Sequence, residues 1–94
     1  MSWSVRFHPE VYFDLEQLGK AGAHRVFKVI EERIAEGEPD KIGKALSGVL
    51  AGHRRIRTGN LRIVYKVVGT EIILIVCVGA RRDDEVYETA TRRV

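Results

Sequence analysis

The chain has 94 residues, of which 45% are hydrophobic and 31% charged. This balance is typical of a globular protein and excludes disordered and collagen-like chains, while the length fits one domain spanning 1–94. The longest apolar run, Ile72 to Val78, is too short to span a membrane, and the first residues lack the pattern of an export signal. We therefore expect a cytoplasmic protein without membrane contact. The single cysteine, Cys77, can form neither an internal disulfide nor a zinc cluster.

The positive charge is concentrated in one segment. The net charge is only +3, but segment 41–70 contains no acid and carries +7, so the remainder carries −4. The seven basic residues of segment 41–70 are Lys41, Lys44, Arg54, Arg55, Arg57, Arg62 and Lys66. Such a segment is either a solvated face or a binding site for phosphates or an acidic protein segment. The excess of arginine over lysine favours bidentate recognition of phosphate or carboxylate.

The first half of the chain predicts a strand followed by two helices. Apolar and polar residues alternate over 3–7, as in a half-buried strand. Val11, Leu15 and Leu18 form a helical stripe that ends at Gly19. A second helix is expected from Gly22 or Ala23, and Gly37 ends it. The short link predicts an antiparallel helix hairpin.

The second half predicts three strands and a short helix. Segment 43–52 is glycine-rich and irregular, and the strands are expected at 54–57, 61–68 and 71–78, joined by glycine-containing turns. The last strand is apolar throughout, which indicates a central strand covered on both faces. A terminal helix is expected over 83–93. The fold class is therefore α+β in the order β-α-α-β-β-β-α: an N-terminal strand, an antiparallel helix hairpin packed on one sheet face, a three-stranded antiparallel meander and a short C-terminal helix.

Strand periodicity places several basic side chains on one face. Residues two apart in a strand share a face, so His53, Arg55 and Arg57 point one way while Arg54 and Ile56 point the other. Across the turn, Arg62 and Val64 alternate with Ile63 and Tyr65, and Arg81 and Tyr87 follow the last strand. Each arginine taken alone could be an ordinary surface charge. Together they indicate an open face built for an anion, because charges on a half-buried sheet are costly unless solvated or paired.

Four motifs in this order resemble those of the RelE/ParE toxin superfamily over nearly the whole chain. They are Leu46-x-Gly, His53-Arg-Arg-Ile-Arg-x-Gly-x-x-Arg62-Ile-Val-Tyr65, Val78-Gly79-x-Arg81 and Glu85-Val-Tyr87. The C-terminal pattern is closer to the RelE branch than to ParE. The resemblance implies a RelE-like fold and a toxin of a type II toxin–antitoxin system. It also implies a cognate antitoxin partner in a hetero-oligomeric complex, and cleavage of mRNA in the A site of the 30S subunit, which inhibits translation.

The resemblance also implies the site residues. RelE-type toxins cut RNA by attack of the ribose 2′-hydroxyl on the adjacent phosphate, using basic strand residues, an arginine after the last strand and a C-terminal tyrosine. The matching positions are Arg55, Arg57, Arg62, Arg81 and Tyr87. His53 and Arg55 stand where well-known RelE members carry lysines. We assign catalysis to Arg62, Arg81, Tyr87, Arg55 and His53, and RNA binding to Arg54, Arg57, Lys44, Lys41 and Arg82.

The chemistry of each residue type limits its role. Such cleavage needs a base, an acid and stabilisation of the charge on the phosphoryl oxygens, and arginine suits only the last task because it stays protonated. A tyrosine such as Tyr87 could act as base beside cations or could stack on a nucleobase. Histidine is the one residue type among these candidates that normally titrates close to neutral pH, and His53 is the histidine near the basic residues. This scheme requires no metal or other cofactor.

Two other functions remain open. A ParE-like DNA gyrase inhibitor would share the fold without nuclease activity, and a non-toxic module would use the basic groove to bind an acidic peptide. Arginines that splay to opposite faces, or that are each locked to an internal carboxylate, would refute the nuclease interpretation.

Overall fold

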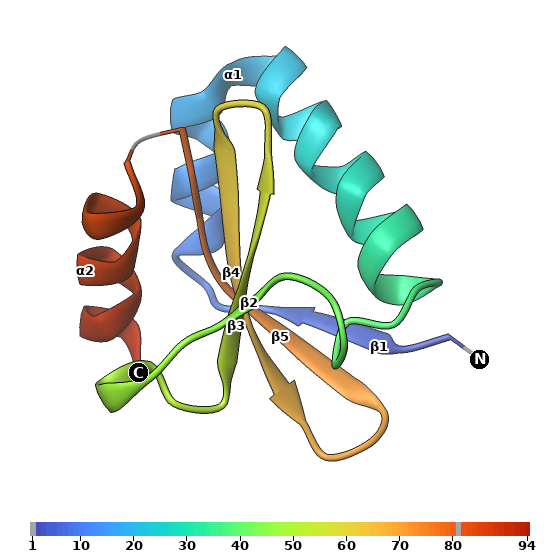
Figure 1. The fold of residues 1–94 in the computed structure, drawn as a ribbon. Coiled ribbons are helices and arrows are strands. Elements are labelled where there is room, and N and C mark those ends of the chain that lie inside the picture. Colours follow the sequence, from blue (N-terminus) through green and yellow to red (C-terminus); the bar gives the residue numbers. More distant parts are fainter. Residues whose placement is uncertain (1, 81) are drawn as a thin grey trace.

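The computed structural model describes residues 2–80 and 82–94 (Figure 1). Strand β1 (Ser4–Phe7) leads into helix α1 (Val11–Val29), which continues as the π-helical turn η1 (Ile30–Ala35). A short strand β2 (Lys44–Ala45) and the 3-10 turn η2 (Gly48–Leu50) precede strands β3 (His53–Thr58), β4 (Leu61–Val68) and β5 (Ile72–Gly79). Helix α2 (Asp83–Arg93) ends the chain. The predicted α+β element order is therefore confirmed.

The sheet is wider than the predicted meander. It has five strands in the order β1-β5-β4-β3-β2, and β1 runs parallel to β5 while the other neighbours are antiparallel. The meander β3-β4-β5 forms its centre, as expected. The N-terminal strand and the two-residue strand β2 extend it on either side. Both additions depend on pairing between distant segments, which local periodicity does not report.

Helix α1 bends into two arms at Gly19, whose backbone angles (φ 77°, ψ 176°) are non-helical. Glycine reaches positive φ without the steric cost that a side chain imposes, so the predicted break between two helices falls at this residue. Val11 and Leu15 of the first arm are buried, as are Val26, Ile30 and Ile34 along the second. These side chains pack against one sheet face, on which Ile56, Leu61, Ile63, Tyr65, Ile73, Ile75 and Val78 lie.

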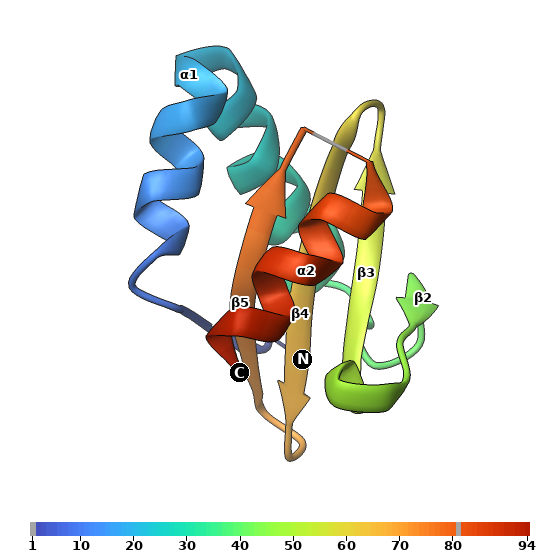
Figure 2. The ribbon, with the colours of Figure 1, turned by 90° about the vertical axis from the view of Figure 1, so that its left-hand side faces the viewer.

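Helix α2 covers the opposite face of the sheet. Figure 2 shows it crossing β4 and β5 in front, with the second arm of α1 behind. Val86 and Ala90 of α2 pack with Leu50, Val64, Val76 and Cys77. The apolar strand β5 is thus buried on both faces, as its composition predicts. Among the described residues, no helix is both long and apolar enough to cross a membrane.

Candidate active site

Three arginines lie on the sheet face that α2 covers. In the β3–β4 hairpin Arg55 is opposite Val64 and Arg57 is opposite Arg62, whereas Ile56 is opposite Ile63 on the face packed against α1. Directly opposed residues share a face, so the alternation predicted from sequence is confirmed for these side chains. We call Arg55, Arg57 and Arg62 the arginine cluster.

Asp83, the first residue of α2, binds two members of this cluster. Its Oδ1 accepts a hydrogen bond from Arg62 Nε at 2.6 Å, and its Oδ2 lies 3.3 Å from Arg55 Nη2. The side chains of Arg55 and Arg62 are only 14% and 16% exposed. The cluster is therefore partly neutralised from within, although Arg57 at the end of β3 is exposed.

The surroundings of Asp83 favour its charged form. Burial alone would raise the pKa of this carboxyl, but the hydrogen bond from Arg62 and the charges of Arg55 and Arg57 outweigh that effect and hold the pKa below its usual range. The carboxylate consequently persists at neutral pH and stays bound to the guanidinium groups.

Tyr87 reaches the cluster from the next turn of α2. Its hydroxyl accepts a hydrogen bond from Arg55 Nε at 3.1 Å, and the residue packs against the apolar side chains between α2 and the sheet. On the other side of the cluster an open hollow of about 310 Å³ is lined by Arg62, Ala80, Arg82 and Glu85. Arg62 is thus reachable from solvent beside the Asp83 contact.

His53 is not brought into this group. It lies on the face that α2 covers, opposite Lys66, but it is 4% exposed beneath the turn η2. Its Nδ1 lies 3.2 Å from the Leu50 carbonyl oxygen and 3.3 Å from that of Ala51, and its Nε2 is buried without a partner among the described residues. The side chain is placed to hold the turn before β3.

Arg54 lies on the opposite face from the cluster, as the alternation predicts. Its Nε donates to the Ile42 carbonyl at 2.6 Å, and the Tyr65 hydroxyl donates to the Pro39 carbonyl at 2.7 Å. Both side chains thus secure the loop that precedes β2. The structure therefore does not bring Arg54 together with the arginine cluster, and its guanidinium bonds to backbone carbonyls on the other face of the sheet.

The other predicted RNA-binding residues differ in position. Lys44 of β2 is exposed and lies opposite Arg55, so it extends the basic face. Lys41 is exposed and pairs with Glu38 at 3.2 Å in the loop before β2. Arg82 is 81% exposed and lies 3.8 Å from Asp84, at the rim of the hollow beside Arg62. Arg81 lies outside the described residues.

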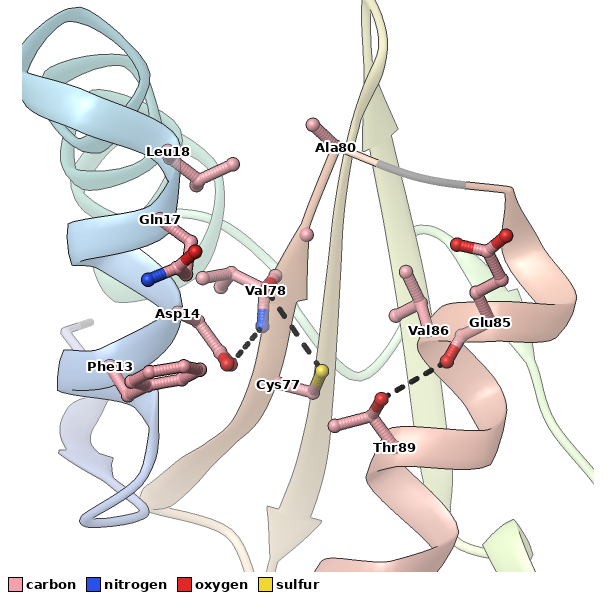
Figure 3. Close-up of a pocket in the computed structure, with 11 residues that line it drawn as sticks. Phe13, Asp14, Gln17, Leu18, Cys77, Val78, Ala80, Glu85, Val86 and Thr89 are labelled. Atoms are coloured by element: carbon pink, nitrogen blue, oxygen red, sulfur yellow. Dashed lines mark hydrogen bonds between the residues drawn. The ribbon is translucent and has the colours of Figure 1, made fainter.

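A separate pocket of about 420 Å³ lies between α1, β5 and α2 (Figure 3) and includes none of the predicted site residues. At its floor Asp14 accepts a hydrogen bond from the Val78 amide at 3.1 Å. Asp14 also forms a bidentate pair with Arg93, at 2.6 and 2.8 Å, and both side chains are buried. This pair anchors the last turn of α2, as Asp83 anchors the first.

Sequence reasoning did not find Asp83, Asp14 or Arg93. Asp83 belongs to an acidic run that directly follows two arginines, and an acid at the start of a helix is common enough to draw no attention. Asp14 had a weak signal, since it interrupts the apolar stripe of α1 between Val11 and Leu15. Within residues 2–80 and 82–94, no three histidine, cysteine or acidic side chains gather as a metal site requires.

The family profile described as ParE toxin of type II toxin–antitoxin system, parDE, matches residues 5–85. No curated protein sequence matches the chain. A solved chain of the RelBE2 toxin–antitoxin complex of Mycobacterium tuberculosis is 27% identical, with a TM-score of 0.77 over 86% of this chain and 100% of that one.

Two solved structures of mutant Escherichia coli toxin RelE are each 24% identical over 100% of this chain and 99% of theirs. The free toxin has a TM-score of 0.77, and its complex with an antitoxin RelBc peptide has 0.69. At this identity the match shows the shared fold. From the family profile and this geometry together, the chain belongs to the ParE toxin family of type II toxin–antitoxin systems, within the RelE/ParE superfamily, and has the fold of the RelE toxins.

Proposed function

We propose that this toxin is a metal-independent, ribosome-dependent mRNA endoribonuclease. The observation that supports this most is the arginine cluster, with three guanidinium groups on one sheet face and the Tyr87 hydroxyl bonded to one of them. Guanidinium groups remain charged and bind two phosphate oxygens at once, which suits a transition state whose charge builds on those oxygens.

In the proposed reaction the ribose 2′-oxygen attacks the adjacent phosphorus and loses its proton to a base. The bond from phosphorus to the 5′-oxygen breaks as that oxygen takes up a proton, which leaves a 2′,3′-cyclic phosphate and a 5′-hydroxyl. Arg62 and Arg81 stabilise the phosphoryl charge, and Arg55 and Arg57 hold the neighbouring backbone. Tyr87 contacts the reacting nucleotide, by proton transfer or by stacking.

The hollow beside Arg62 is open, so the chain alone orients RNA poorly. The ribosome would hold the mRNA in place and so supply part of the alignment, a contribution worth several kcal/mol. A cognate antitoxin would neutralise the basic face with carboxylates and form a hetero-oligomeric complex. The M. tuberculosis structure and one of the two E. coli structures are complexes of a toxin with its antitoxin or an antitoxin peptide, which supports such a partner.

The test is cleavage of a defined mRNA with and without programmed ribosomes. We expect efficient cutting only on ribosomes, and Arg62→Ala or Arg81→Ala should each lose about 2–4 kcal/mol of transition-state stabilisation, as when one oxyanion donor is removed. Arg92→Ala is the matched control, because Arg92 is 66% exposed and pairs with Glu88 on α2. Wild-type rates in both Arg62→Ala and Arg81→Ala, or equal cutting of free mRNA, would contradict the proposal.

A second candidate function is inhibition of DNA gyrase. The observation that favours it is the family profile, whose description names ParE toxins. A gyrase supercoiling assay run beside the mRNA assay separates the two functions. Loss of supercoiling at toxin concentrations that leave ribosome-bound mRNA intact would favour the gyrase inhibitor.

A further inference from the structure

Asp83 occupies the arginine cluster in the way a substrate anion would. Its two oxygens reach two different guanidinium groups, at 2.6 Å from Arg62 Nε and 3.3 Å from Arg55 Nη2. A phosphate group on the same arginines would present oxygens to the same N–H groups. The carboxylate and a phosphate are therefore competitors for one set of donors, and their like charges repel.

Part of the donor set of Arg55 and Arg62 is already in use. Arg55 Nε donates to the Tyr87 hydroxyl at 3.1 Å, and Arg62 Nη1 donates to the Asn60 carbonyl at 2.9 Å. With Asp83 in place, both arginines thus have two of their nitrogens occupied, and both side chains are largely shielded from solvent. A phosphate that binds through Arg62 Nε and Arg55 Nη2, the nitrogens that now contact Asp83, must displace the carboxylate.

The anchoring of α2 allows that displacement. The last turn is fixed by the buried pair between Arg93 and Asp14, whereas the Asp83 side chain in the first turn is 31% exposed. Helix ends open at lower cost than buried turns, because fewer apolar contacts are lost. The Asp83 side chain can therefore leave the cluster while Val86 and the rest of the helix stay packed.

We propose that Asp83 is an internal competitor of RNA, an autoinhibitory contact that a substrate phosphate must displace. The inference rests on the proposed function, because it takes RNA to be the ligand of the arginine cluster. A single small anion gains too little from the cluster to displace a carboxylate already in place. A single-stranded RNA backbone has neighbouring phosphates that also reach exposed Arg57 and Lys44, and these contacts offset the cost of opening.

The test compares Asp83→Asn with Asp84→Asn. Both changes remove one negative charge from the first turn of α2, but the Asp84 side chain is 74% exposed and lies 3.8 Å from Arg82, outside the cluster. The probe is a short RNA strand with 2′-O-methyl groups, which cannot be cut, and its dissociation constant is measured by fluorescence anisotropy at fixed salt. We expect Asp83→Asn to bind about fivefold more tightly than wild type, and Asp84→Asn to stay close to wild type.

Equal affinity of the two variants, weaker binding by Asp83→Asn, or no binding by any of the proteins would overturn the inference. Asp83→Ser should give the same gain in RNA affinity, because serine is favoured at helix starts. This second variant keeps the test valid if Asp83→Asn folds poorly. Circular dichroism checks that both remain folded. Because the probe cannot be cut, failure of ribosomal cleavage would contradict only the nuclease proposal, whereas an unchanged affinity with normal cleavage would contradict only this inference.

Discussion

The thiol of Cys77 lies between β5 and α2 at the edge of the 420 Å³ pocket, and only 2% of the residue is exposed. Burial is the main cause that raises its pKa to about 12, and the nearby Asp14 carboxylate adds to the effect. Since the thiolate is the reactive form, the native thiol should resist alkylation. We expect iodoacetamide at pH 8 to modify the denatured chain fully and the native chain only as fast as it unfolds. Rapid labelling of the native protein, measured by mass spectrometry, would show that α2 does not cover this thiol.

At the same scale, some site residues follow from sequence and others do not. Alternation in a strand is a local rule, so it correctly separates Arg55 and Arg57 from Arg54. It does not report what covers each position, and His53 is buried because the turn η2 folds over it. Asp83 was missed for the same reason: its contacts with Arg62 and Arg55 span 21 and 28 positions of sequence.

Helix α2 is held by a charged contact at each end with a small apolar strip between them. The contact at the C-terminal end of α2 joins Arg93 and Asp14, whose side chains are 6% and 9% exposed. Removing one member of a buried pair leaves an uncompensated charge, which costs about 3–5 kcal/mol. We expect Asp14→Asn to lower the free energy of unfolding by about that amount in urea denaturation. Glu10→Gln is the control, because Glu10 is 65% exposed and lies 3.9 Å from Arg93; equal losses in both variants would refute the buried-pair account.

The contact of Asp83 with the arginines, at the N-terminal end of α2, predicts that the stability of the fold depends on pH. Arg62, Arg55 and Arg57 face Asp83 from the strands, and they hold its folded-state pKa below the unfolded value of about 3.9. The contact therefore stabilises the fold above that value and is lost as pH falls through the lower, folded-state pKa. Asp83→Asn should be about 1 kcal/mol less stable than wild type at pH 7, and the difference should shrink below about pH 4. A difference that stays constant down to pH 3, with Asp84→Asn as reference, would contradict this.

For the whole molecule, local patterns predict the element order and the two-sided burial of β5. The positions of β1 and β2 at the sheet edges were not predicted, because a parallel pairing across 68 positions, such as Ser4 with Ile72, leaves no local signal. The same holds for the site. The sequence brings the arginines to one face, but only the folded chain shows that α2 delivers both the Tyr87 hydroxyl and the Asp83 carboxylate to them.

The central claim is that the arginine cluster holds a phosphate while the neighbouring 2′-hydroxyl attacks it. The most direct measurement uses programmed ribosomes carrying mRNA in which the single ribose at the mapped cut site is 2′-deoxy. The account predicts a 2′,3′-cyclic phosphate end on the unmodified mRNA and no cut at the substituted position. Unchanged cleavage of the deoxy-substituted mRNA would mean that another nucleophile attacks the phosphate, and it would contradict the mechanism.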